Sequence, residues 1–198
     1  MAGNRMLMKK IKSWIPCNIV AVILVLIFIS IYFVFKGNDD ACFNFGATGM
    51  DYLHGDYYRW ITCLFLHYNI GHLFVNSAAL LSVSSLLGSF LKKRQFFFLF
   101  MFGGIPAEIA YSIVISDQIY DIGASSGIFA LIACLVVCIL RFPEQFHVIW
   151  YRLDVIIVIV YFVFANTSIT AFLVHTFGFA FGILISFFLI LTGRINIR

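Results

Sequence analysis

The segment GASSGIFALIACLVVCIL, residues 123–140, sets two serines among small residues directly before a long apolar run. Two interpretations are open from this segment alone. Small residues let neighbouring helices approach closely in lipid, so the pattern is typical of helix packing. A serine among small residues is also typical of a nucleophile, whose hydroxyl must be reached by a substrate and a base. The rest of the chain has to distinguish the two.

The composition indicates a membrane protein. The chain has 198 residues, of which 63% are hydrophobic and 11% charged, whereas a soluble domain carries about 25% charged residues. Apolar runs close to the ~20 residues that span a bilayer recur along the chain. The sequence therefore predicts an all-α polytopic membrane protein with six transmembrane helices, at residues 15–35, 70–90, 96–116, 123–140, 155–164 and 171–191.

The charges predict the orientation of these helices. Eleven of the thirteen Lys and Arg lie in the head, in the loops after the second and fourth runs, and in the tail. Nearly all Asp residues lie in the other loops. Basic loops stay on the cytoplasmic side of a membrane, so both termini are predicted to be cytoplasmic. The protein is predicted to reside in the cell membrane. The net charge of +4 is thus explained by topology, and no nucleic-acid partner is expected.

The chain is predicted to consist of two regions. Residues 1–14 form a basic cytoplasmic segment, and residues 15–198 form the six-helix domain. Within that domain, residues 36–69 form an outer loop rich in aromatic side chains, which we expect to be ordered at the membrane interface. The five cysteines are odd in number and form no CxxC pair, which argues against a disulfide framework and a zinc site. No cofactor or metal is expected.

Polar side chains gather at the start of each even-numbered helix. His72 and Asn76 open the second, Ser125 the fourth and His175 the sixth. Polar groups are costly in lipid, so each needs a reason. All three helices run from outside to inside, which places these side chains at one depth near the outer face. The glycines at 178 and 182 share a face with His175 and are predicted to press the sixth helix against the fourth.

This set fits nucleophilic catalysis. A serine hydroxyl needs a base within hydrogen-bond reach, and His175 is the only histidine in the later helices. No Asp or Glu is found at the outer ends of the even-numbered helices to orient it, so a dyad is predicted. His72 and Asn76, with the backbone N–H of Ser125, are the available donors to an oxyanion. No HExxH metalloprotease motif occurs, and Glu108 is interpreted as a structural residue.

Four motifs in this order resemble the rhomboid family of intramembrane serine proteases. Residues 55–60 (GDYYRW) resemble its Trp/Arg loop motif, with the two residues in swapped order. Residues 72–76 (HLFVN) resemble its HxxxN motif, and residues 123–126 (GASS) its GxSG motif. His175, with glycines three and seven residues later, resembles its sixth-helix motif. The matches cover all but the first helix.

The resemblance implies Ser125 as nucleophile, His175 as base, His72 and Asn76 as oxyanion donors, and Gly123 as the small residue that opens the site. It also implies that Phe129 packs beside His175. The fifth helix and the turn at 166–170 would form a lateral gate and cap. The partners would be the lipid bilayer and a transmembrane helix of a substrate protein, which enters sideways, unwinds near the outer face and is cleaved after small side chains.

Two alternatives accompany this prediction. The usual glycine after the nucleophile is Ser126 here, but ungapped alignment through residues 128–131 favours Ser125 over Ser126. The chain could also be a non-catalytic rhomboid-like protein that binds membrane helices, although such a protein would be expected to lack Ser125 or His175. A transporter or channel would need polar residues through the full membrane depth, whereas here they stop near the outer face.

Overall fold

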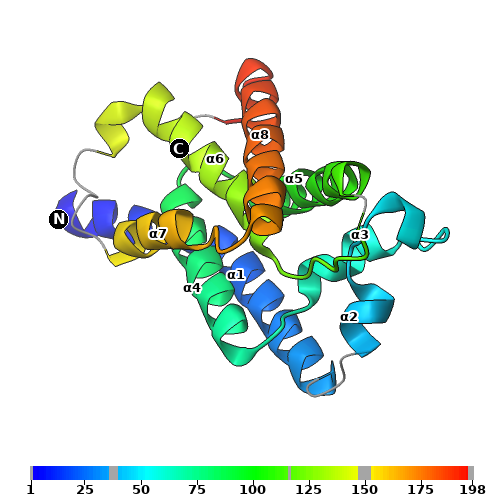
Figure 1. The fold of residues 1–198 in the computed structure, drawn as a ribbon. Coiled ribbons are helices and arrows are strands. Elements are labelled where there is room, and N and C mark those ends of the chain that lie inside the picture. Colours follow the sequence, from blue (N-terminus) through cyan, green and yellow to red (C-terminus); the bar gives the residue numbers. More distant parts are fainter. Residues whose placement is uncertain (1, 36–39, 116, 147–152, 196–198) are drawn as a thin grey trace.

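The protein is a bundle of helices (Figure 1). The computed structural model describes residues 2–35, 40–115, 117–146 and 153–195. Six longer helices correspond to the six predicted apolar runs: α1 (Ala2–Phe35), α4 (Ile70–Leu87), α5 (Lys93–Val114), α6 (Ser125–Arg141), α7 (Leu153–Phe164) and α8 (Ile169–Leu191). The loop regions add α2 (Asp40–Phe45), α3 (Arg59–Thr62) and three single 3-10 turns, Met50–Tyr52, Cys63–Phe65 and Pro143–Gln145.

The lengths of the helices bear on how many cross the membrane. In the described part of the chain, three helices, α4, α5 and α8, are long and apolar enough to do so by length and composition. The apolar part of α1, residues 19–35, is shorter, and so are α6 with 17 residues and α7 with 12. At a rise of ~1.5 Å per residue, α6 spans about 26 Å, close to the thickness of a hydrocarbon core. The all-α membrane fold is thus confirmed, and the count of six spans stays a prediction.

Helix α6 lies at the centre of the bundle. It packs against α4, α5 and α8, and every residue from 125 to 135 is buried. A helix that is apolar all round is one that neighbours surround, which is why this segment shows no polar face. Figure 1 shows α6 passing between α4 and α8. Among the described residues, the segment with the two serines is therefore part of the longest uninterrupted buried stretch.

Glycines bring α8 into contact with the α6 backbone, as the sequence predicted. A Cβ atom added at Gly178 would lie 2.3 Å from the carbonyl oxygen of Ser126, and one added at Gly182 would lie 2.5 Å from that of Ala130. Neither distance is tolerated by a real Cβ atom. A Cβ at Gly103 of α5 would likewise lie 2.2 Å from the Cβ of Ala130. Small side chains thus set the separation of α5, α6 and α8.

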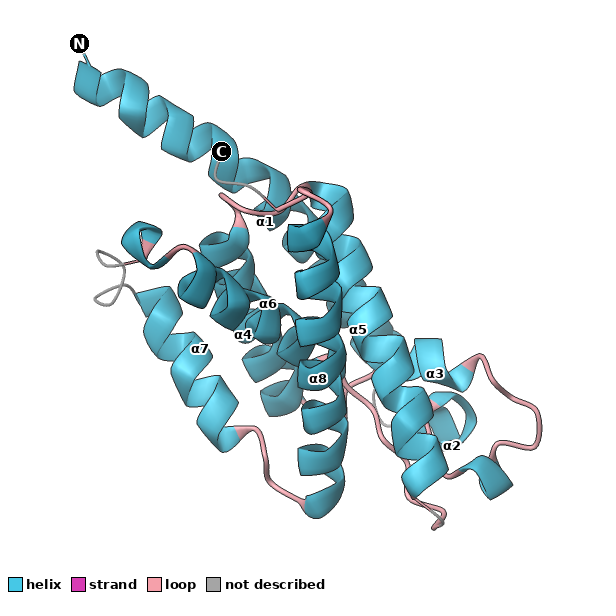
Figure 2. Cartoon of the chain, turned by 90° about the horizontal axis from the view of Figure 1, so that it is seen from above, coloured by secondary structure: helices cyan, strands magenta, loops and turns pink. Residues whose placement is uncertain are grey.

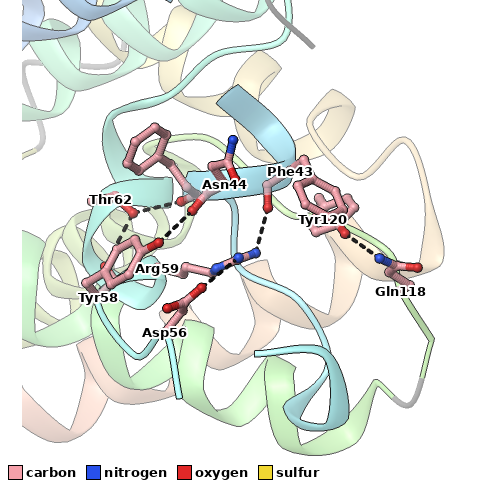
Figure 3. A network of polar contacts seen from close by, with 9 residues as sticks. Phe43, Asn44, Asp56, Tyr58, Arg59, Thr62, Gln118 and Tyr120 are labelled. Atoms are coloured by element: carbon pink, nitrogen blue, oxygen red, sulfur yellow. Dashed lines mark hydrogen bonds and ion pairs between the residues drawn. The ribbon is translucent and has the colours of Figure 1, made fainter. Parts of the chain in front are cut away.

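Residues 40–69 of the outer loop form short helices and turns, as expected for a segment rich in aromatic residues. Figures 1 and 2 place α2 and α3 together beside α5, while Figure 2 shows the first turns of α1 extending beyond the bundle. The Trp60 indole donates to the Ser112 hydroxyl at 3.0 Å, which joins α3 to α5. Figure 3 shows Arg59 between Phe43 and Asp56: its guanidinium donates to the Phe43 carbonyl at 2.6 Å and to the Asp56 carboxylate at 2.9 Å.

Replacing Arg59 with alanine is expected to loosen this loop. Arg59 is buried, with 6% of its surface exposed, and its loss leaves the Phe43 carbonyl without the guanidinium donor. Charge-assisted hydrogen bonds contribute about 1.5–3 kcal/mol each, so the thermal midpoint should fall and protease cleavage within 40–62 should accelerate. Arg59→Lys should recover little, because an ammonium lacks the planar fork. Tyr58→Phe, which removes an exposed hydrogen bond to the Asn44 carbonyl, is the control and should change the midpoint little.

Candidate active site

The first turns of α4, α6 and α8 enclose a cavity of about 470 Å³. Four of the residues singled out in the sequence line it: His72 and Asn76 from α4, Ser125 from α6 and His175 from α8. The remaining walls come from the loop before α6, the end of α7 and the turn before α8, and include Ile119, Tyr120, Asp121, Tyr161, Phe164 and Ala165. Side chains from three helices far apart in the sequence thus meet in one space.

Gly123 lies directly against the two α4 side chains. A Cβ added there would be 2.9 Å from the Nε2 atom of His72 and 3.5 Å from the Nδ2 atom of Asn76. Its φ of +142° is also a conformation that residues with side chains rarely adopt. The Nε2 atom of His72 and the Nδ2 atom of Asn76 therefore both face the backbone just before Ser125. This is where donors to an oxyanion would be needed if Ser125 attacked a carbonyl.

The amide of Asn76 is held in one orientation by α7. The Tyr161 hydroxyl donates to Asn76 Oδ1 at 2.5 Å, so the Nδ2 group points the other way, and it has no partner among the described residues. The backbone N–H of His72 donates to Asn69 Oδ1, the N-cap of α4, at 2.8 Å. The Tyr68 ring stacks on the His72 ring at 5.9 Å. The two candidate donors are thus positioned before any ligand binds.

The ring of His175 is fixed by two neighbours. It stacks on Phe129, with ring centres 4.2 Å apart and planes 6° from parallel, and Phe129 lies one turn after Ser125 on α6. Its Nδ1 atom lies 2.8 Å from Asn166 Oδ1 in the turn before α8. Only 5% of the residue is exposed. The packing against Phe129 agrees with the family resemblance, whereas the contact with Asn166 had no signal in the sequence.

The two adjacent serines have different surroundings. Ser125 lines the cavity that contains His175, while Ser126 is fully buried and is not among the cavity residues. Ser126 instead faces Glu108 of α5, as do the side chains of Asp121 and Cys63. In the described part of the chain, neither carboxylate oxygen of Glu108 meets a partner in hydrogen-bond geometry. Consecutive residues of a helix point about 100° apart, so the two hydroxyls serve different environments.

The loop that leads into α6 is hydrogen-bonded to the outer loop. Asp121 and Ala47 exchange two backbone hydrogen bonds, of 2.7 and 3.0 Å, and Gly123 N–H donates to the Cys63 carbonyl at 2.9 Å. Tyr68 also donates to the Tyr120 carbonyl. These bonds join the predicted interfacial loop to the residues directly before Ser125. The outer loop therefore contributes to the shape of the cavity. Of its own residues, the last two, Tyr68 and Asn69, line the cavity.

His67 takes no part in the cavity lining. It precedes α4, and its ring centre lies 5.1 Å from that of Phe28 and 5.2 Å from that of His72. Burial, followed by repulsion from His72, lowers the pKa of His67 to about 3, so this ring is neutral at physiological pH. Among the described residues, no three His, Cys, Asp or Glu side chains are grouped so that they could hold a metal ion.

Asp121 is expected to make stability depend on pH. Burial raises the pKa of Asp121 from 3.8 to about 6, and the neighbouring ionisable groups are Glu108, Cys63 and Tyr111. Between about pH 4 and 6 the folded chain keeps a proton that the unfolded chain releases, so stability falls as pH rises through this window. The shift corresponds to about 1–3 kcal/mol, with the lower end applying because the side chain is partly exposed.

Asp121→Asn should remove this dependence, because the amide does not titrate. Denaturation in detergent micelles at pH 4, 5, 6 and 7.5 measures it, and the variant should be the more stable protein at pH 7.5. Asp117→Asn, in the same loop and exposed, is the matched control. Parallel stability curves for the wild type and Asp121→Asn would contradict the assignment.

Comparison with known families identifies the fold that carries this cavity. The family model described as the Rhomboid domain matches residues 54–192, from the outer loop to the end of α8. A search of curated proteins found no match. The matched range covers more than half of the chain and includes every residue that lines the cavity. The chain therefore belongs to the rhomboid family.

Proposed function

We propose that the protein is a serine endopeptidase that cleaves peptide bonds in or near transmembrane segments of other membrane proteins. The observation that carries the proposal is that Ser125 and His175 line one cavity, with the His72 and Asn76 nitrogens directed at the backbone before Ser125. Nucleophile, base and oxyanion donors are the three groups that acyl transfer needs. The family, whose members are generally intramembrane serine proteases, supports the same conclusion.

Hydrolysis would proceed through an acyl-enzyme. Ser125 Oγ attacks the scissile carbonyl carbon while its proton passes to His175. The carbonyl oxygen becomes an oxyanion that accepts hydrogen bonds from His72, Asn76 and the backbone N–H of Ser125. His175 then protonates the leaving amine as the C–N bond breaks. Water, deprotonated by His175, hydrolyses the ester and restores the serine. The free N–H groups of the first turn of α6 add positive potential at the same point.

The substrate would be a transmembrane helix that unwinds near the end of the bundle. The cavity has a volume within the range of ligand sites, and its walls combine the polar groups above with the apolar side chains of Val75, Ile119 and Phe164. Gly123, which abuts His72, leaves room beside Ser125 for the scissile carbonyl, and a small preceding side chain would be favoured. We place both termini in the cytoplasm and the cavity on the outer side, on the basis of the distribution of Lys and Arg.

The alternative is a non-catalytic protein of the same family that binds membrane helices. It predicts a different set of polar side chains in the cavity. Binding alone needs no paired serine and histidine and no orphan amide directed at the serine backbone. Asn76 Nδ2 is buried and has no hydrogen-bond partner among the described residues; an unsatisfied buried donor destabilises by about 1–3 kcal/mol, which a purely binding protein would have no reason to retain. This observation favours the enzyme.

The test is cleavage of a transmembrane reporter by the purified protein in liposomes. The reporter carries small residues at the outer end of its helix, and the products are identified by mass. Labelling with a fluorophosphonate, followed by peptide mapping, reports the nucleophile independently of substrate choice. A single cut near the outer end and a label on α6 are expected. A helix-binding protein would retain the reporter without cutting it and would remain unlabelled.

A further inference from the structure

Asn166 is the one described polar side chain in hydrogen-bond contact with the catalytic histidine of the proposed function. Its Oδ1 atom lies 2.8 Å from His175 Nδ1. It lies in the turn between α7 and α8, nine residues before His175, and the sequence assigned this turn only to the cap of the cavity. The sequence predicts no carboxylate that could orient the histidine; in the structure an amide occupies that position.

The second hydrogen bond of Asn166 establishes which atom faces the ring. Its Nδ2 group donates to the Phe162 carbonyl, one turn earlier in α7, at 3.3 Å, so Oδ1 is the atom directed at His175. A carbonyl oxygen only accepts hydrogen bonds, so Nδ1 of the neutral ring must carry the proton. The other ring nitrogen, Nε2, is then unprotonated. This is the tautomer in which His175 can take a proton from a serine hydroxyl.

Phe129 and Asn166 constrain different motions of the ring. Stacking on Phe129 at 4.2 Å fixes the plane of the imidazole, and the hydrogen bond to Asn166 fixes its rotation within that plane. Each contact alone leaves one motion open. Together they determine where Nε2 points, and a misplacement of about 1 Å in a catalytic group can cost 10²-fold in rate.

We propose that Asn166 is the positioning residue of a Ser125–His175–Asn166 triad, which replaces the dyad predicted from the sequence. The inference rests on the proposed function and deepens it. Asn166 lies in an exposed turn, whereas the ring that it contacts is buried, so the amide reaches a histidine that solvent barely reaches. An amide in the third position of a triad also has a chemical precedent in cysteine proteases, where it orients the histidine.

This arrangement makes the cap part of the catalytic machinery. Asn166 is held between Phe162 of α7 and His175 of α8, so a displacement of the turn would also release the histidine ring. A substrate that enters past α7 would have to leave this hydrogen bond intact, or restore it, before the serine can be deprotonated.

The experiment compares Asn166→Ala, Asn166→Asp and the wild type in the reporter assay over pH 5–9. Asn166→Ala should lower kcat about 10–100-fold, with KM changed less than twofold and with slower fluorophosphonate labelling of Ser125. Asn166→Asp should restore most of kcat and move the acid limb of the pH profile to higher pH, because a carboxylate stabilises the protonated ring. Thr176→Ala, on the exposed side of α8 next to His175, is the control and should match the wild type.

The outcomes separate the two proposals. Wild-type kcat and an unshifted pH profile in both Asn166 variants would overturn the triad while the proposed function stands. A wild-type protein that neither cleaves nor is labelled would overturn the proposed function itself. If Asn166→Ala does not fold, as judged by its thermal midpoint, the pH profile of Asn166→Asp decides: a shifted acid limb supports the triad, and an unchanged one refutes it.

Discussion

Ser125→Ala is expected to abolish cleavage of a transmembrane reporter, and Ser126→Ala is expected to leave most of it. Ser125 lines the cavity that contains His175, whereas Ser126 is fully buried and faces Glu108. Removing the nucleophile of a serine hydrolase lowers kcat by roughly four orders of magnitude or more. Removing the Ser126 hydroxyl takes away a polar group that faces another polar group, so a modest change in stability is the expected result.

Both variants should be measured in the same liposomes, with initial cleavage rates and fluorophosphonate labelling as readouts. Their thermal midpoints show whether each remains folded. Ser125→Cys extends the test, because a thiol retains a nucleophile at the same place and should allow labelling by a thiol reagent. Full activity in Ser125→Ala, or loss confined to Ser126→Ala in a folded protein, would show that the adjacent serine attacks.

Gly178→Val is expected to have the second largest effect. Even a single carbon at this position would lie 2.3 Å from the Ser126 carbonyl and 3.0–3.1 Å from two further backbone atoms of that residue. Backbone cannot move aside as a flexible side chain can, so α8 must shift away from α6. Overpacking of this kind costs about 1–3 kcal/mol or more. Because His175 is one turn before Gly178 on the same helix, the shift would also separate His175 from Ser125.

Loss of both stability and cleavage distinguishes this variant from those in the catalytic groups. Ala180→Val is the matched control: it lies two residues later on the exposed side of α8, where added carbons meet lipid. It should keep the wild-type thermal midpoint and activity. Gly178→Ala should fall between the two. A Gly178→Val protein with wild-type midpoint and rate would show that α8 is not held against α6 by this glycine.

The helices and the grouping of polar residues were predictable from local patterns. Runs of apolar residues located all six longer helices, five of them to within a few residues, because lipid tolerates little other than continuous helix. The exception is α1, which begins at Ala2, within the basic segment that was predicted to precede a helix starting at residue 15. The spacing of His175, Gly178 and Gly182 predicted which face of α8 packs, and the structure places that face on α6. The outer loop was expected to be ordered, but its contacts with the residues before Ser125 were not foreseen.

Contacts between distant, locally ordinary residues were not predictable. Glu108 had no identifiable partner in the sequence, yet in the structure it faces Asp121, Ser126 and Cys63, which come from two loops and another helix. Tyr161 had no assigned role and orients Asn76 across 85 residues. These pairs depend on how helices cross, and the pattern of one helix does not contain that information.

The sequence by itself determined that this chain is a helical membrane protein and that the two serines, the histidines and the asparagine lie at one end of it. It did so because hydrophobic length, charge distribution and helical period are local properties that act through lipid and backbone alone. Only the tertiary structure decided the different surroundings of Ser125 and Ser126 and the amide that orients His175. These depend on the distance between α6 and α8 and on the path of one turn, which the packing of the whole bundle sets.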